Sequence, residues 1–169
     1  MSGTTLAELN AAAPAGFVAR LGHLFEHSPW VAEETYPRRP FRDAKQLHAE
    51  LCATMHRAAR DRRLALIRAH PDLAERMDEL TAASAREQAG AGLDQLGEVE
   101  RAEFRALNAA YRTRFGFPFV ICARLNAKGL ILQAMHRRLQ NSPEEEEAAA
   151  LEEIEKIAWL RLADMVNTT

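Results

Sequence analysis

Apolar residues recur at intervals of three and four along almost the whole chain, which is the spacing that places them on one face of an α-helix. The alternation of apolar and polar residues that is typical of a half-buried strand is almost absent. This periodicity predicts an all-α fold. At 169 residues the chain is long enough to bury a core of its own, so residues 1–169 are expected to form a single-domain helical bundle.

Prolines, glycines and capping residues divide the periodic pattern into segments. Helices are expected over 14–26, 29–36, 43–60, 61–70 and 71–80, briefly within 81–96, and over 98–114, 126–139 and 143–166. Asp43 is the expected N-cap of the third helix, and Ser142 that of the last. The stretch FGFPFVICA at 115–123 contains Gly116 and Pro118, and it is the one segment expected to be extended.

The overall composition argues against several classes of protein. With a formal net charge of -2, the chain offers no broad positive field for nucleic acid. No stretch approaches the roughly 20 apolar residues of a membrane span, and no basic segment followed by an apolar run opens the chain. Cys52 and Cys122 lack CxxC spacing and are expected to be buried thiols. We therefore expect a cytoplasmic protein that binds neither membrane nor nucleic acid.

His70 lies at a predicted break between two helices, in the stretch RAHPDLAE at 68–75. Pro71 lacks an amide hydrogen and disfavours helical geometry in the residue before it, so the incoming helix should end near Ala69 or His70. Pro71 and Asp72 suit the first turn of a following helix. At such a corner an imidazole can face a cleft and exchange protons with a ligand. A histidine on the surface or hydrogen-bonded in the core is the alternative.

The stretch SAREQ at 84–88 has two compatible interpretations. Ser84 followed three positions later by Glu87 is the spacing of a capping box, which would make Ser84 the start of a helix. A helix N-terminus that carries Ser84, Glu87 and Gln88 also offers donors and acceptors for a polar ring and its carboxylate. Glu87 is the natural carboxylate partner for His70, but sequence spacing alone does not bring the two together.

Other patterns suggest different kinds of site. His23 and His27 lie one helical turn apart with Glu26 between them, which would suit a divalent metal, but no third ligand stands at a typical spacing. The arginines of 57–68 could contact phosphate, although they lack interleaved aromatic residues. The acidic run 144–147 is most simply a helix start. The phenylalanines of FGFPF suit a core better than a stacking platform.

Six stretches occur together in one known family. They are EHSPW at 26–30, RPF at 39–41, AHPDLA at 69–74, SAREQAGAGL at 84–93, LNAAYRTRFGFPFV at 107–120 and RLADM at 161–165. In this order and at these intervals they resemble the 2-oxo-4-hydroxy-4-carboxy-5-ureidoimidazoline (OHCU) decarboxylases, and the resemblance spans nearly the whole chain. It implies an all-α carboxy-lyase, usually a homodimer, that forms (S)-allantoin in the last step from urate to allantoin. It also implies that the enzyme needs neither metal nor organic cofactor.

The resemblance implies roles for individual residues. The family's catalytic histidine falls on His70 and its active-site glutamate on Glu87. A C-terminal arginine of the family corresponds to Arg161 and is expected to bind substrate. The other implied substrate-binding residues are Pro71, Ser84, Ala85, Arg86, Gln88, Phe119, Val120, Ile121, Cys122 and Ala123. The chain ends in NTT, without the peroxisomal tripeptide of many eukaryotic members, so the cytoplasm stays the expected compartment.

Two other classes of protein remain as alternatives. A non-enzymatic helical interaction domain would use the corner histidine and the SAREQ helix as scaffolding, and allantoin or related purines would not stabilise it. A metal protein built on His23 and His27 would contain metal after purification and would be sensitive to chelators.

Overall fold

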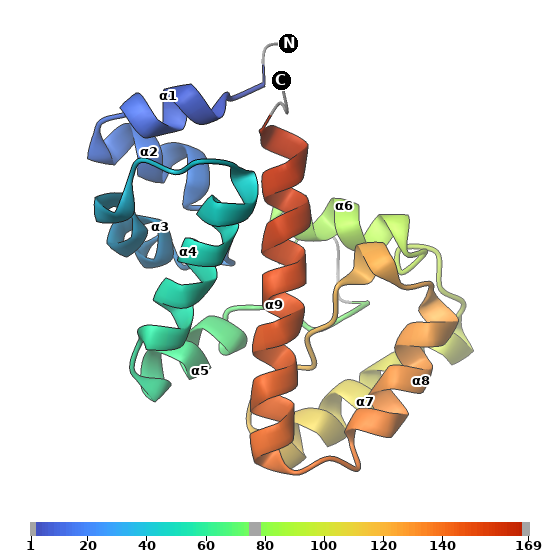
Figure 1. Ribbon diagram of the computed structural model, residues 1–169. Helices are drawn as coiled ribbons and strands as arrows, with labels where there is room; N and C mark the ends of the chain where they lie inside the picture. Colours follow the sequence, from blue (N-terminus) through green and yellow to red (C-terminus); the bar gives the residue numbers. More distant parts are fainter. Residues whose placement is uncertain (1–2, 75–78, 167–169) are drawn as a thin grey trace. The chain divides into compact units, whose positions relative to one another are not determined.

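The structure, a computed structural model, describes residues 3–74 and 79–166. Within these ranges the chain forms nine α-helices and no β-strand (Figure 1). An isolated parallel bridge between Thr4 and Val166 is the one β pairing in the described part of the chain. None of the described helices is both long and apolar enough to cross a membrane. The all-α prediction is confirmed.

The chain divides into two compact units. The first comprises residues 1–69 and 155–169, and the second comprises residues 70–154. The boundary therefore falls directly before His70 and again inside the last helix. The assignment of residues 1–169 to one domain stays a prediction.

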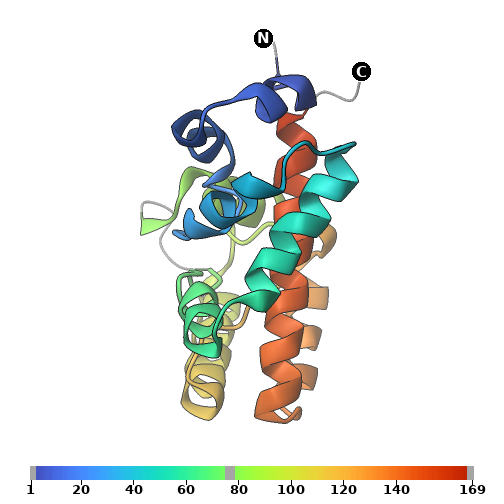
Figure 2. The ribbon, with the colours of Figure 1, turned by 60° about the vertical axis from the view of Figure 1, so that its left-hand side comes forward.

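The first unit contains five helices and the C-terminal part of a sixth. They are α1 (Leu6–Ala11), α2 (Pro14–Leu21), α3 (Trp30–Thr35), α4 (Ala44–Arg57), α5 (Arg60–Arg68) and the end of α9 (Pro143–Met165), with a 3-10 turn, η1 (Tyr36–Arg38), after α3. α3 packs against α2 and α4. Figure 2 shows α4 beside the C-terminal part of α9, where His48 Nε2 donates to the carbonyl of Glu155 at 2.8 Å. Phe17, Leu47 and Leu51 are fully buried in the core of this unit.

Local capping explains where several of these helices begin. The carboxylate of Asp43 accepts a hydrogen bond from the amide of Gln46 at 2.7 Å, which confirms the predicted N-cap of α4. α1 lies outside the predicted helices. Thr5 and Glu8 form a capping box there, in which the side chain of each accepts a hydrogen bond from the amide of the other.

The helix predicted over 14–26 ends early, at Leu21. Gly22 is its C-cap, and His27 has a positive φ of 45° that is incompatible with a continuing helix. His23 and His27 therefore do not share a helical face. The sequence suggested a metal site because the two residues would lie one helical turn apart, and this assumption is wrong. No group of three or more His, Cys, Asp or Glu side chains in the described residues could hold a metal ion.

The second unit contains α6 (Ala82–Gly90), α7 (Glu98–Phe115), α8 (Lys128–Arg138) and the first part of α9, with a 3-10 turn, η3 (Ala123–Leu125), before α8. α7 and α8 lie side by side (Figure 1). α7 ends at Phe115, and its C-cap is Gly116, whose φ of 77° is the left-handed conformation that glycine adopts without strain. Residues 118–122 have no regular secondary structure, and Cys122 has extended backbone angles, which agrees with the extended segment predicted near 115–123.

The helix predicted over 71–80 is wrong in its described part. α5 ends at Arg68 with Ala69 as its C-cap, so the corner expected at His70 is confirmed. Residues 71–74 then form a loop with a turn, and Ala74 has a φ of 63°. Residues 75–78 of the predicted helix lie outside the described residues.

Candidate active site

His70 is the first residue of the second unit, and it is buried, with 6% of its surface exposed. Two side chains of α7 hold the loop that follows it. Asn108 Nδ2 donates to the carbonyl of Leu73 at 2.9 Å, and Arg112 Nε donates to both carboxylate oxygens of Asp72 at 2.8 and 3.0 Å. α7 therefore fixes the chain two and three residues after the histidine.

Gln88 connects α6 to the same loop. Its Oε1 accepts a hydrogen bond from the backbone N–H of Ala74 at 3.0 Å, and its side chain is buried. Because Ala74 has left-handed backbone angles that residues other than glycine rarely adopt, this bond holds a strained turn. Gln88 Nε2 has no hydrogen-bond partner among the residues that the structure describes, so it is available as a donor to a ligand.

Ser84 lies within α6 and does not begin it. The N-cap of α6 is Thr81, whose hydroxyl accepts a hydrogen bond from the amide of Ser84 at 3.2 Å. The capping-box interpretation of Ser84 and Glu87 is therefore wrong, because Thr81 occupies the cap position three residues earlier. Ser84 is instead buried in the first turn, while Glu87 is half-buried. Of the two remaining SAREQ residues, Ala85 is half-buried and Arg86 is exposed.

The segment Phe119–Ala123 is buried along its whole length. α6 packs against η3, which begins at the end of this segment, so the SAREQ helix adjoins it. Burial raises the pKa of the Cys122 thiol above its usual value, and the negative charges of Glu153 and then Glu87 raise it further. The carboxylate of Glu87 is therefore within electrostatic reach of this segment.

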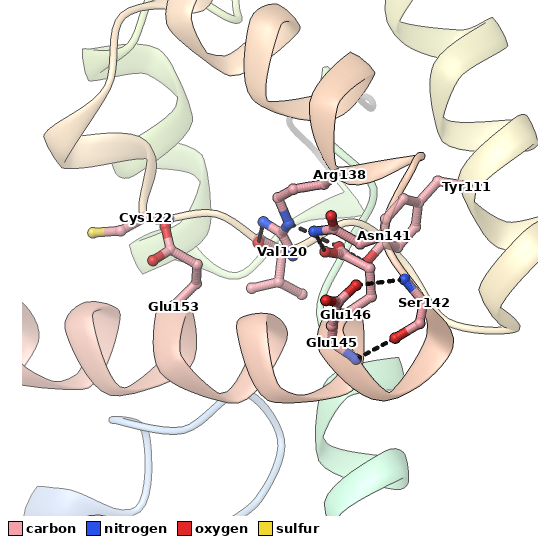
Figure 3. A network of polar contacts seen from close by, with 9 residues as sticks. All are labelled: Tyr111, Val120, Cys122, Arg138, Asn141, Ser142, Glu145, Glu146 and Glu153. Carbon is pink, nitrogen blue, oxygen red and sulfur yellow. Dashed lines mark hydrogen bonds and ion pairs between the residues drawn. The ribbon is translucent and has the colours of Figure 1, made fainter.

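A buried polar network supports the segment from α7, α8 and α9 (Figure 3). One carboxylate oxygen of Glu146 accepts hydrogen bonds from the Tyr111 hydroxyl at 2.6 Å and from Arg138 Nε at 2.8 Å. Its other oxygen accepts from Asn141 Nδ2 at 2.9 Å. Arg138 Nη1 donates to the carbonyl of Val120 at 2.7 Å. Burial and the bond to Glu146 hold the pKa of the Tyr111 hydroxyl above its usual value, so Tyr111 stays a donor.

Some backbone N–H and C=O groups of the segment Phe119–Ala123 are hydrogen-bonded, and others are not. The N–H of Cys122 donates to Glu153 at 3.3 Å (Figure 3), and its carbonyl accepts from Asn126 Nδ2 at 3.0 Å and from the N–H of Leu125 at 3.1 Å. The N–H and C=O of Ile121, in contrast, have no hydrogen-bond partner within the described ranges. Since buried backbone groups are normally paired, those of Ile121 are candidates for ligand binding.

Arg161 belongs to the first unit. Its Nη2 donates to the carboxylate of Glu26 at 3.0 Å, and its Nη1 donates to the carbonyl of His23 at 3.3 Å. The side chains of this ion pair are only 5% and 2% exposed. Pairing with Glu26 accounts for the burial of Arg161, and its contact with substrate stays a prediction.

Four supporting residues lie outside the predicted site: Asn108, Tyr111, Arg138 and Glu146. Asn108 and Tyr111 belong to the LNAAYR stretch, where their polar groups interrupt the apolar face of a helix. The acidic run 144–147 begins α9 as predicted, with Glu146 in the first turn, and Glu146 is in addition fully buried. The signal for these residues was a polar side chain on a buried helix face.

Known proteins of one family are similar to this chain over nearly its whole length. The family model described as OHCU decarboxylase matches residues 10–163. The chain is 43% identical over 164 residues to the 2-oxo-4-hydroxy-4-carboxy-5-ureidoimidazoline decarboxylase of Haloferax volcanii, and the match covers 97% of each chain. The crystal structure of an (S)-allantoin synthase is similar with a TM-score of 0.81 and 32% identity, covering 98% of this chain and 54% of that one.

This chain therefore spans about half the length of that synthase. A crystal structure of OHCU decarboxylase in the presence of (S)-allantoin shares the fold, with a TM-score of 0.67 and 24% identity over 80% of this chain and 89% of that one. The family match and the identity to the Haloferax enzyme both extend over nearly the whole length. The chain belongs to the OHCU decarboxylase family.

Proposed function

We propose that this protein is a carboxy-lyase that converts OHCU to (S)-allantoin, the last step from urate to allantoin, without a metal or organic cofactor. The observation that carries this proposal is the hydrogen bond between Gln88 and Ala74. It joins the helix that bears Glu87 to the loop that follows His70. Membership of the OHCU decarboxylase family supports the same activity.

The chemistry suits a site of this kind. Breaking the bond to a carboxylate leaves an electron pair, and many decarboxylases use a cofactor to accept it. In OHCU the carboxylated carbon bears a hydroxyl and adjoins unsaturated ring nitrogens and carbonyls, so the ring itself can accept the pair. Positioned acid and base groups typically supply about 10²–10⁴ in rate. The protein therefore has to orient the substrate, exclude water from it and protonate the product.

We assign the proton transfers to His70, whose buried position after α5 removes it from bulk water. Glu87 and the Nε2 group of Gln88 hold the ring or ureido edge of the substrate. Arg161 neutralises the carboxylate or binds the ureido tail. Substrate contacts are also assigned to Pro71, Ser84, Ala85, Arg86, Phe119, Val120, Ile121, Cys122 and Ala123. Return of the proton to one face yields one enantiomer, whereas the spontaneous reaction yields a racemate.

The test supplies OHCU freshly from urate with urate oxidase and the hydrolase of the next step, and follows the circular dichroism of the product. Rapid appearance of optically active allantoin, unchanged by a chelator, is expected. Slow formation of racemic allantoin by folded protein would refute the proposal and favour an interaction domain. Inhibition by the chelator would favour a metal protein.

The role of His70 is tested by His70→Asn, which should abolish activity and leave the far-ultraviolet spectrum unchanged. His136→Asn is the matched control, because His136 lies exposed on α8 beside Glu103. It should retain wild-type turnover. Wild-type turnover in His70→Asn would rule out a catalytic role for this histidine.

We further propose that residues 1–169 act as a single decarboxylase domain, that the protein is a homodimer, and that it works in the cytoplasm. Light scattering coupled to size-exclusion chromatography should give twice the mass of one chain. A monomer with full activity would separate catalysis from dimerisation.

A further inference from the structure

The segment Phe119–Ala123 is held by a charged side chain from another helix. Arg138 donates from Nη1 to the carbonyl of Val120 at 2.7 Å, and the centre of its guanidinium lies 4.3 Å from the centroid of the Phe119 ring. The first contact fixes a backbone carbonyl, and the second is a cation–π contact with the preceding residue. One side chain thus fixes two successive residues of the segment.

Arg138 is itself fixed by its partners (Figure 3). Glu146 orients the guanidinium through Nε, and the Tyr111 hydroxyl orients Glu146. The Tyr111 ring also meets the Phe119 ring edge-on, with centroids 5.4 Å apart and planes at 89°. Tyr111 therefore contacts the segment directly and also acts on it through Glu146 and Arg138.

Stability alone does not explain an arginine at this position. The buried face of α8 consists of Ile131, Ala134, Met135 and Arg138, so an apolar side chain would continue the stripe. Replacing a buried ion pair by apolar residues is often neutral or stabilising. Arg138 Nη2 is moreover buried without a hydrogen-bond partner in the described part of the chain, which is unfavourable. What the arginine provides uniquely is the bond to Val120.

We propose that Arg138 is a positioning residue for the decarboxylation. The Val120 carbonyl shares a peptide plane with the Ile121 N–H, so the bond from Arg138 to this carbonyl holds the unpaired Ile121 N–H in one orientation, and the contact with the Phe119 ring fixes the residue before it. A ureidoimidazoline carries C=O groups that can accept a hydrogen bond from this N–H. This inference rests on the proposed function, because it assigns Ile121 to the binding of that substrate.

The test is Arg138→Lys, with kcat and KM measured on fresh OHCU and the Kd measured for (S)-allantoin. Lysine keeps the positive charge beside Glu146, but its single ammonium cannot reproduce the fork that joins Glu146 to Val120. We expect kcat/KM to fall about 10- to 100-fold, because a displacement of about 1 Å caused by a distant substitution can cost about 100-fold. We expect (S)-allantoin to bind about tenfold more weakly. Arg137→Lys, at the exposed neighbouring position, should behave as wild type.

A second control separates positioning from stability. Thr35→Val in the first unit removes the buried hydrogen bond between Thr35 and Thr54, which measures 2.7 Å, and should lower Tm without changing kcat/KM. If Arg138→Lys loses no more kcat/KM than Thr35→Val, Arg138 is only structural and the inference is overturned.

If Arg138→Lys does not fold, Tyr111→Phe provides the test, because it keeps the ring against Phe119 and removes only the hydroxyl that orients Glu146. A severalfold lower kcat/KM supports the inference, and wild-type kinetics overturn it. Inactive wild-type protein would instead refute the proposed function, and the inference with it. Active wild-type protein with unchanged variants would refute the inference alone.

Discussion

Removing Glu146 alone should be among the most destabilising single changes in the second unit. The Glu146 side chain is 0% exposed and that of Arg138 is 7% exposed, so Glu146→Leu leaves a guanidinium buried without its counter-charge. Such a loss costs about 3–5 kcal/mol. At about 2–4 °C per kcal/mol for a chain of this size, Tm should fall by roughly 6–20 °C. Glu144→Leu, at an exposed position of the same acidic run, should cost less than about 1 kcal/mol.

Removing the whole network should restore much of this loss. In the triple variant Tyr111→Phe, Arg138→Met and Glu146→Leu, neither charge of this network remains. The carbonyl of Val120 is then the main group without a partner, at a cost of about 1–3 kcal/mol. The triple variant should therefore be more stable than Glu146→Leu by about 2 kcal/mol.

Urea unfolding followed by far-ultraviolet circular dichroism measures these differences, and equal m values allow the midpoints to be compared as free energies. A triple variant that is no more stable than Glu146→Leu would show that the uncompensated charge is not the cause of the loss. The same variant should have a lower kcat/KM than wild type, since it also lacks the bond from Arg138 to Val120.

Four further variants test local features. Burial, and after it the negative charge of Glu155, raise the pKa of the Cys52 thiol from 9.0 to about 12. The thiol therefore loses its proton at a lower pH in the unfolded protein than in the folded one, and the free energy of unfolding should fall as the pH rises from about 9 to 12. In Cys52→Val, urea titrations over this pH range should show a smaller fall. Gly116→Ala should lower the free energy of unfolding by about 1 kcal/mol, because the φ of Gly116 is 77°. Gly129→Ala, inside α8, should instead raise the free energy of unfolding by about 0.5–1 kcal/mol. No atom obstructs the added methyl group at either position. Asn108→Leu should lower the urea midpoint by removing the buried bond to the carbonyl of Leu73.

The helices were largely predictable because most of them bury one regular face. α7 and α9 lie within one residue of their predicted limits, since caps and glycines mark their ends. Residues 22–26 show where this reasoning fails. Leu24 and Phe25 are buried and continue the apolar pattern of α2, yet they lie in a loop after Gly22. Periodicity alone does not distinguish a buried loop from another helical turn.

The sequence contains a signal for α1, the helix that lies outside the predicted helices. Thr5 and Glu8 stand at the spacing of a capping box, the same signal that was assigned to Ser84 and Glu87. In α6 a second candidate, Thr81, competes for the cap position and occupies it. Where two residues could cap the same helix, the N-cap is the one whose hydroxyl reaches the first free amides of the helix.

The sequence stretches that form the candidate site could be predicted, whereas the residues that support it from α7, α8 and α9 could not. Arg137 and Arg138 are identical neighbours in the sequence, and only the phase of α8 places one in solvent and the other in the core. Glu145 and Glu146 differ in the same way at the start of α9. Helix phase becomes certain only when the packing partners are known, because a shift of one residue moves a side chain by about 100°.

One face of α7 contacts two parts of the candidate site, the loop after His70 and the segment Phe119–Ala123. Asn108 and Arg112 hold the loop after His70, and Tyr111, which lies on the same face at i+3, meets Phe119. Any displacement of this helix would change both parts at once, so substitutions that tilt it cannot tune one without the other. Attempts to engineer a broader substrate range should therefore keep α7 constant and begin in SAREQ at the exposed Arg86 and the half-buried Ala85.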